Sequence, residues 1–130
     1  MLSVARTIRV AVANQPRLMR ELMVMTLDDE QDVEVVAEII DEMEISRTVE
    51  ETKPEFLIVA LDSERFGAEA REAILRQHPD MKILALASDG NSFAVFSVLE
   101  GISTVIHEGS EEEILRVMRG RSEVNGGGLS

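Results

Sequence analysis

Apolar runs alternate with amphipathic stretches along the whole chain. Five segments are almost continuously apolar: residues 8–13, 33–40, 56–61, 82–87 and 104–107. Runs of this kind, without a regular polar alternation, are typical of parallel strands that are buried on both faces. The stretches between them carry apolar residues at spacings of three and four, which predicts helices. The pattern as a whole predicts five βα units around a parallel sheet.

Helices are predicted between these strands and after the last one. Pro16 is expected to open the first helix, because proline is favoured at the first helical position. A helix must end before Pro54, since the residue that precedes a proline is steered out of the helical region. Ser110 followed by three glutamates predicts a capped helix start. The five helices are expected at residues 16–25, 41–52, 68–77, 92–100 and 110–119.

The length of 130 residues and the hydrophobic content of 45% suit one domain with a proper core. We expect this domain at residues 1–120, followed by a flexible Gly-rich tail or linker at residues 121–130. No apolar run approaches the about 18 residues that span a bilayer, and no signal peptide is recognised. A cytoplasmic protein without membrane contact is therefore expected.

The formal charge of −12 comes from 25 acidic and 13 basic residues. Such a field repels nucleic-acid phosphates, and neither Trp nor Tyr is present to stack on bases. Direct nucleic-acid binding is therefore not expected. The acidity is expected to keep the chain soluble, and a basic protein surface would also suit it.

A resemblance runs through five segments of the sequence, which read in order IRVAVANQPRLMREL, DVEVVAEI, KPEFLIVAL, RQHPDMKILALAS and EGISTVIHEGSEEEIL. They resemble the receiver domains of bacterial response regulators, above all the NarL/FixJ/LuxR-type branch, whose output is usually a helix-turn-helix. The resemblance covers about residues 8–119. It implies an α/β fold, namely a flavodoxin-like doubly wound five-stranded parallel sheet of order 2-1-3-4-5 with helices on both faces. It also implies a functional site outside the carboxyl ends of the strands.

Receivers of this family take up a phosphoryl group on an aspartate at the end of the third strand. That aspartate and acids after the first strand hold Mg²⁺, while a hydroxyl after the fourth strand and a lysine after the fifth stabilise charge. The matching positions in this chain are Ala13 and Asn14 for the acids, Ala60 for the acceptor, Ala87 for the hydroxyl and His107 for the lysine, the last with a one-residue deletion near Ser103. The resemblance therefore implies a degenerate phosphorylation site with no catalytic residue, no metal site and weak or absent Mg²⁺ binding.

Asp62 is the candidate for a substitute phosphoacceptor. It lies two residues beyond Ala60, on the same side of the strand by alternation, and is displaced by about 6–7 Å along the chain. Without an acid at position 13 we expect a solvated loop residue, and Asp62 with Glu64 would bind a cation only weakly. A histidine at position 107 could sense pH, although it is expected simply to replace an accessible lysine.

Two predicted helices carry more apolar residues than a core-facing stripe requires. In the first, the core stripe is expected at residues 18, 22 and 25, so Met19 and Met23 would add an adaptable contact surface. In the helix predicted at residues 92–100, Phe93 and Phe96 are expected to stay outside or half-buried. These four residues are the predicted protein interface, with burial under neighbouring elements as the alternative.

The sequence thus predicts a pseudo-receiver in signal transduction that is not an enzyme. It would form a homodimer or dock a protein partner without aspartate phosphorylation, and it could belong to a transcription regulator whose DNA-binding output domain lies outside this chain. One alternative is a phosphoaccepting receiver of a two-component phosphorelay that uses Asp62. A second is a ligand-binding flavodoxin-like domain, although its loops lack phosphate-cradling glycines.

Overall fold

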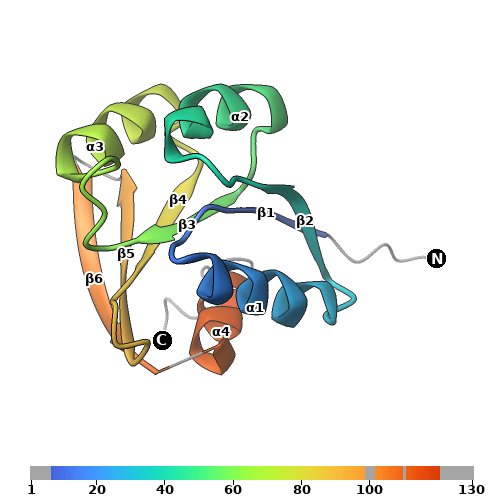
Figure 1. The fold of residues 1–130 in the computed structure, drawn as a ribbon. Helices are drawn as coiled ribbons and strands as arrows, with labels where there is room; N and C mark the ends of the chain where they lie inside the picture. Colours follow the sequence, from blue (N-terminus) through green and yellow to red (C-terminus); the bar gives the residue numbers. More distant parts are fainter. Residues whose placement is uncertain (1–6, 99–101, 110, 121–130) are drawn as a thin grey trace, which may run out of the picture.

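The computed structural model describes residues 7–98, 102–109 and 111–120, so the predicted tail at residues 121–130 lies outside the described residues. A sheet of six strands in the order β2-β1-β3-β4-β5-β6 forms the centre of this described part (Figure 1). The strands are β1 (Ile8–Val12), β2 (Val33–Glu38), β3 (Phe56–Ala60), β4 (Lys82–Leu86), β5 (Ser92–Val98) and β6 (Ile102–Glu108).

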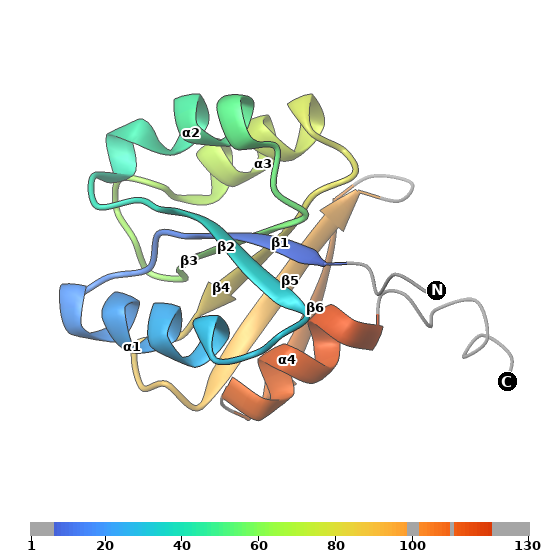
Figure 2. The ribbon, with the colours of Figure 1, turned by 90° about the vertical axis from the view of Figure 1, so that its right-hand side faces the viewer.

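Helices cover both faces of the sheet, with α1 and α4 on one face and α2 and α3 on the other (Figures 1 and 2). They are α1 (Arg17–Asp28), the short 3-10 helix η1 (Glu42–Glu44), α2 (Ile45–Thr52), α3 (Ala68–Gln77) and α4 (Glu111–Gly120). The predicted three-layer α/β fold is confirmed, and so is the parallel order of the first four strands. None of these described helices is long and apolar enough to cross a membrane.

The central strand β3 is buried along its full length, and its side chains alternate between two separate cores. Phe56 and Ile58 pack with α1 and α4, whereas Leu57 and Val59 pack with α2 and α3. A strand whose side chains fill both cores needs an apolar residue at every position. This is why the apolar runs of the sequence located the parallel strands correctly.

The helix predicted at residues 92–100 is wrong over residues 92–98, which form the strand β5, and residues 99–100 lie outside the described residues. Phe93 and Val95 point into the core under α1 and α4, while Phe96 and Val98 pack against the core under α2 and α3. Aromatic and β-branched residues that alternate between two buried faces suit a strand. A helix would have had to leave one of these apolar faces exposed.

The sheet consequently has six strands where five were expected. β5 runs antiparallel to β4, and β6 runs antiparallel to β5. A tight turn joins β4 to β5, in which the Gly90 amide donates to the Ala87 carbonyl (3.0 Å) and Gly90 has a positive φ of 75°. The last strand therefore lies one strand position farther from β4 than the predicted order requires.

The predicted core stripe of α1 is also wrong, because Leu18 and Met25 are each 66% exposed. The helix instead turns Arg20, Met23 and Leu27 toward the sheet. Both sets have spacings of three and four, so spacing alone does not fix the rotation of the helix. The buried Arg20 is tolerated because it donates to the carboxylate of Glu38 (3.0 Å) and the side-chain oxygen of Gln15 (3.1 Å).

The predicted interface changes accordingly. Met23 and Phe93 are core residues, with Phe93 only 1% exposed, so neither offers a free surface. Met19 and Phe96 are half-buried. The exposed apolar stripe of α1 is formed by Leu18, Leu22 and Met25 instead.

Candidate functional site

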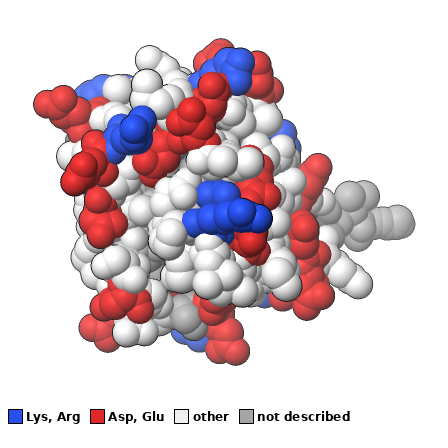
Figure 3. All heavy atoms as spheres, viewed as in Figure 1, with Lys and Arg blue, Asp and Glu red and all other residues white. Residues whose placement is uncertain are grey.

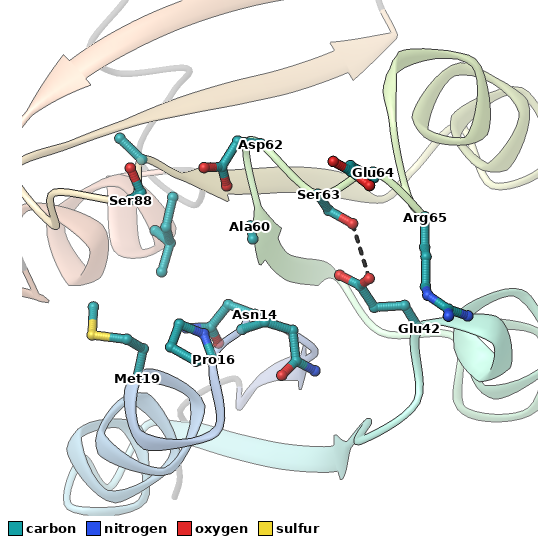
Figure 4. Close-up of a pocket in the computed structure, with 13 residues that line it drawn as sticks. Asn14, Pro16, Met19, Glu42, Ala60, Asp62, Ser63, Glu64, Arg65 and Ser88 are labelled. Carbon is teal, nitrogen blue, oxygen red and sulfur yellow. Dashed lines mark hydrogen bonds between the residues drawn. The ribbon is translucent and has the colours of Figure 1, made fainter.

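A pocket of about 600 Å³ lies at the carboxyl ends of β1, β3 and β4 (Figure 4). The loop after each of these strands contributes to its wall, and so do the start of α1 and the first residue of η1. This is the edge of a parallel sheet at which ligand sites of α/β folds form. The lining residues are Asn14, Gln15, Pro16, Met19, Glu42, Ala60, Asp62, Ser63, Glu64, Arg65, Leu86, Ala87 and Ser88.

The structure brings three of the five predicted degenerate positions together around this pocket. Asn14 follows β1, Ala60 ends β3 and Ala87 follows β4, and all three line it. Asp62, the predicted substitute acceptor, lines the same pocket from an exposed position in the loop after β3. Ala13 instead lies in the core on the α2 and α3 side, without exposed surface.

His107 does not join the other predicted positions. It pairs across the sheet with Phe93 of β5, and the two rings stack with centroids 5.1 Å apart. Its Nδ1 lies 3.3 Å from a carboxylate oxygen of Glu113 on α4. Because β5 intervenes, β6 lies one further strand spacing of about 4.8 Å from β4. This extra strand separates His107 from the pocket.

The loop after β3 is anchored to η1 by a side-chain hydrogen bond. The Ser63 hydroxyl donates to Glu42 Oε1 (2.9 Å), and the backbone amide of Phe66 donates to the Ser63 oxygen (3.0 Å). Phe66 is itself buried in the core on the α2 and α3 side. Glu42 and Ser63 thereby belong to the pocket wall, although neither was predicted from the sequence.

Two oxygen atoms in the pocket wall are buried without a hydrogen-bond partner among the described residues. They are Oδ1 of Asn14, whose residue is only 1% exposed, and Oε2 of Glu42. An acceptor that is buried and unpaired costs about 1–3 kcal/mol, so such atoms call for an explanation. Asn14 was predicted as a site position, whereas Glu42 carried no signal beyond its place in an acidic helix.

The pocket wall is acidic, since Glu42, Asp62 and Glu64 supply three carboxylates. Arg65 supplies the basic side chain in the described part of the wall. The whole chain has a formal charge of −12, and Figure 3 shows acidic side chains spread over one face with fewer basic ones between them. The local field therefore favours cations and repels anions.

A Mg²⁺ site of the receiver type does not fit these residues. The described part of the chain holds no group of three or more His, Cys, Asp or Glu side chains placed to bind a metal ion. Mg²⁺ prefers carboxylate oxygens in an octahedral arrangement, and the positions after β1 offer alanine in the core and one amide. These residue types therefore do not fit the Mg²⁺ site that the resemblance to receivers implies.

Comparisons with known proteins support the receiver fold. No protein-family model matches the chain. The response regulator domain of CheB from Thermotoga maritima superimposes with a TM-score of 0.55 at 24% identity, over 64% of this chain and 62% of that one. The receiver domain of the putative response regulator NarL from Mycobacterium tuberculosis gives 0.56 at 20% identity, over 64% and 68%. At these identities the two structures establish the fold.

A curated relative adds similarity at the level of sequence. The chain is 28% identical over 93 residues to YhcZ of Bacillus subtilis, described as an uncharacterized transcriptional regulatory protein. The match covers 71% of this chain and 44% of the relative, so the chain spans less than half of that protein. The predicted resemblance to response regulator receivers is confirmed at the level of the fold.

Proposed function

We propose that this chain is a receiver-like signalling module that acts by binding proteins and does not take up a phosphoryl group. The observation that carries the proposal is Ala60, whose methyl group ends β3 in the pocket where receivers place their acceptor aspartate. A methyl group cannot accept a phosphoryl group. The neighbouring alanine at position 13 lies in the core, so β1 does not restore the lost carboxylate. Mg²⁺ binding would accordingly be weak or absent.

The experiment that tests the proposal is intact mass spectrometry after incubation with Mg²⁺ and acetyl phosphate. We expect no phosphoryl adduct on the unmodified chain. Asp62 is the residue at which an adduct would be sought, because it is exposed and lines the pocket. An adduct that disappears in the Asp62→Asn variant would contradict the proposal and support the alternative, a phosphoaccepting receiver of a two-component system.

The surface proposed for protein contact is the outer stripe of α1, formed by Leu18, Leu22 and Met25. A surface helix needs one apolar stripe, and α1 already buries another against the sheet. Either a second copy of the chain or a different protein could cover this stripe. Sedimentation of the chain at several concentrations distinguishes the two, with Leu22→Ser as the variant and Met43→Ser, exposed on η1, as the matched control.

The output proposed for the whole protein is transcription regulation. It is supported by the Bacillus subtilis relative, which is described as a transcriptional regulatory protein and of which this chain spans 44%. A DNA-binding domain outside this chain would then contact the DNA, because the acidic chain itself would repel it. Cytoplasmic location remains a prediction that goes with this proposal.

A further inference from the structure

The wall of the pocket at the carboxyl ends of β1, β3 and β4 contains buried hydrogen-bond acceptors from two separate elements. Asn14 Oδ1 comes from the loop after β1, and Glu42 Oε2 comes from η1. Neither atom has a hydrogen-bond partner among the described residues, and both side chains line the pocket. The Ser63 hydroxyl, a donor in this wall, is already engaged with the other oxygen of Glu42. The two oxygens on this side of the pocket therefore lack hydrogen-bond donors.

The charge of the wall points in the same direction. The carboxylates of Glu42, Asp62 and Glu64 outnumber Arg65, the basic group of the described wall. In Figure 4 the guanidinium of Arg65 lies beyond the carboxylate of Glu42, away from Ala60, whereas the carboxylate of Asp62 lies above Ala60 on the side of Ser88. A ligand that brought both N–H donors and positive charge would satisfy the two buried oxygens and balance the acids.

The remaining wall is apolar and offers room for a carbon body. Pro16 and Met19 lie together on one side in Figure 4, and Ala60 lies on the other. Leu86, the last residue of β4, also lines the pocket. Small side chains at positions 60 and 87 keep this part of the pocket open, and methionine adapts to different shapes. A volume of about 600 Å³ lies within the range of small-molecule sites.

We infer that this pocket binds a small organic cation that carries an amidinium or guanidinium group on an apolar body. The N–H groups would donate to Asn14 and Glu42, Asp62 would contribute charge, and the apolar part would lie against Met19 and Leu86. The inference rests on the proposed function, because it assigns a ligand to a pocket that has lost its phosphoacceptor. Such a ligand would be an input that needs no phosphorylation.

The test uses three probes of the same shape and different charge: benzamidine, benzamide and benzoate. Each is titrated into the full chain at neutral pH while the backbone amide signals are followed by NMR, with Asn14, Asp62 and Ser88 as reporters. We expect benzamidine to bind at least about tenfold more tightly than neutral benzamide, because a hydrogen bond to a charged group is worth this factor or more. Benzoate should not bind.

Two variants locate the site. Glu42→Gln keeps the size of the side chain and its hydrogen bond to Ser63, and should weaken benzamidine binding about tenfold. Glu44→Gln is the matched control, because Glu44 belongs to the same short helix and pairs with Arg47 outside the pocket. It should leave binding unchanged. Asp62→Asn, at an exposed loop position, should also weaken binding even if the change at Glu42 disturbs the fold.

Several results would overturn the inference. Equal affinity for benzamidine and benzamide would show that the positive charge of the ligand does not contribute to binding. Preferred binding of benzoate would show that the pocket binds anions. Binding of none of the probes at millimolar concentration would mean that water satisfies the two oxygens. A phosphoryl adduct in the mass spectrum would overturn the proposed function alone, since cation binding is measured separately and without Mg²⁺ or phosphodonor.

Discussion

The sheet has two halves that differ in how they are covered. In the parallel half, β2 to β4, helices lie on both faces, and the central strand β3 is buried throughout. In the antiparallel half, β5 and β6, the last strand forms an edge of the described sheet, and Ile106 is 66% exposed. The parallel half keeps the strand ends that form the pocket. The antiparallel half has a strand where a helix was predicted. This strand separates His107 from the pocket.

This difference bears on the proposal that the chain does not take up a phosphoryl group, which has a separate ground in each half. In the parallel half the architecture is intact and the residue type has changed, as at Ala60. In the antiparallel half the position itself has moved, because β5 separates β6 from β4. A lysine at position 107 would therefore not reproduce the receiver arrangement, even together with an aspartate at position 60.

The largest expected effect comes from Phe93, which ties β5 into the core shared with the parallel half. Phe93→Ala should lower the free energy of unfolding by about 3–5 kcal/mol, because it opens a cavity in the core under α1 and α4 and removes the ring stacked on His107. Chemical denaturation measures this change. Leu18→Ala on the exposed stripe of α1 is the control and should cost about 0.5 kcal/mol or less.

A cost below about 1 kcal/mol for Phe93→Ala would contradict the strand. It would place Phe93 at the surface, as the predicted helix at residues 92–100 did. The comparison between the two halves would then collapse, because β6 could pair with β4 and the sheet would return to five parallel strands.

The parallel half could be predicted from the sequence because each strand serves two buried faces. A run such as residues 56–60 has no polar residue, and its length between turn signals is typical of a buried strand and too short for a typical helix. Residues 93–96 also form a continuous apolar run, and periodicity does not separate a buried helix from a buried strand. The short turn with Gly90 before this run is a hairpin signal that favours the strand.

The site was predictable only where it follows directly from the strands. Asn14, Ala60 and Ala87 lie at the ends of strands that the sequence predicts, so the predicted strand ends located them in the pocket. His107 could not be located because its position depends on an additional strand. Glu42 reaches the pocket through the course of the chain after β2, which no local pattern of acids encodes.

An arginine packs against each half of the sheet, the buried Arg20 against β2 and the half-buried Arg71 against β5. Substitutions there should act in opposite directions. Arg20→Met removes hydrogen bonds to Glu38 and Gln15, and should lower the free energy of unfolding by about 1.5–3 kcal/mol. Arg71 of α3 lies 4.6 Å from the ring centre of Phe96, and burial lowers the pKa of its guanidinium.

Two nitrogens of Arg71, Nε and Nη1, are buried and have no hydrogen-bond partner within residues 7–98, 102–109 and 111–120. Arg71→Met loses a cation–π contact of about 0.5–1 kcal/mol but relieves unpaired N–H groups that cost about 1–3 kcal/mol. We therefore expect Arg71→Met to raise the free energy of unfolding by about 1 kcal/mol, measured by chemical denaturation. Loss of stability in both Arg20→Met and Arg71→Met would contradict this difference, because it would show that both arginines stabilise the fold.

A smaller effect is expected where α4 is tied to the loop between α1 and β2. Arg119 donates to both carboxylate oxygens of Asp32 at 2.8 Å, and these hydrogen bonds hold the pKa of Asp32 below its usual value near 4. The lowered pKa means that the contribution to stability is complete above that usual value and is lost as the pH falls through the folded-state pKa. Both side chains are partly exposed, so we expect about 0.5–1 kcal/mol at pH 7.

The measurement is the free energy of unfolding of the unmodified chain and of Arg119→Ala between pH 7 and pH 2. The difference between them should be constant above about pH 5 and should vanish as Asp32 is protonated below about pH 4. Arg116→Ala is the matched control on the same helix, since Arg116 is largely exposed and pairs with Glu113. A difference that persists at pH 2 would assign the effect of Arg119 to packing.

The smallest effect is expected at the open edge of the sheet. Ile106 of β6 lies opposite Ala94 of β5, yet Ala94 is buried and Ile106 is exposed. Ile106→Lys should change the free energy of unfolding by less than about 0.5 kcal/mol, because the lysine side chain stays in water. A lysine on an edge strand also opposes strand-to-strand association. If the variant loses more than about 1 kcal/mol, and this loss grows with protein concentration, then a second copy covers β6 and the edge is closed in solution. Chemical denaturation at two protein concentrations decides between the two outcomes.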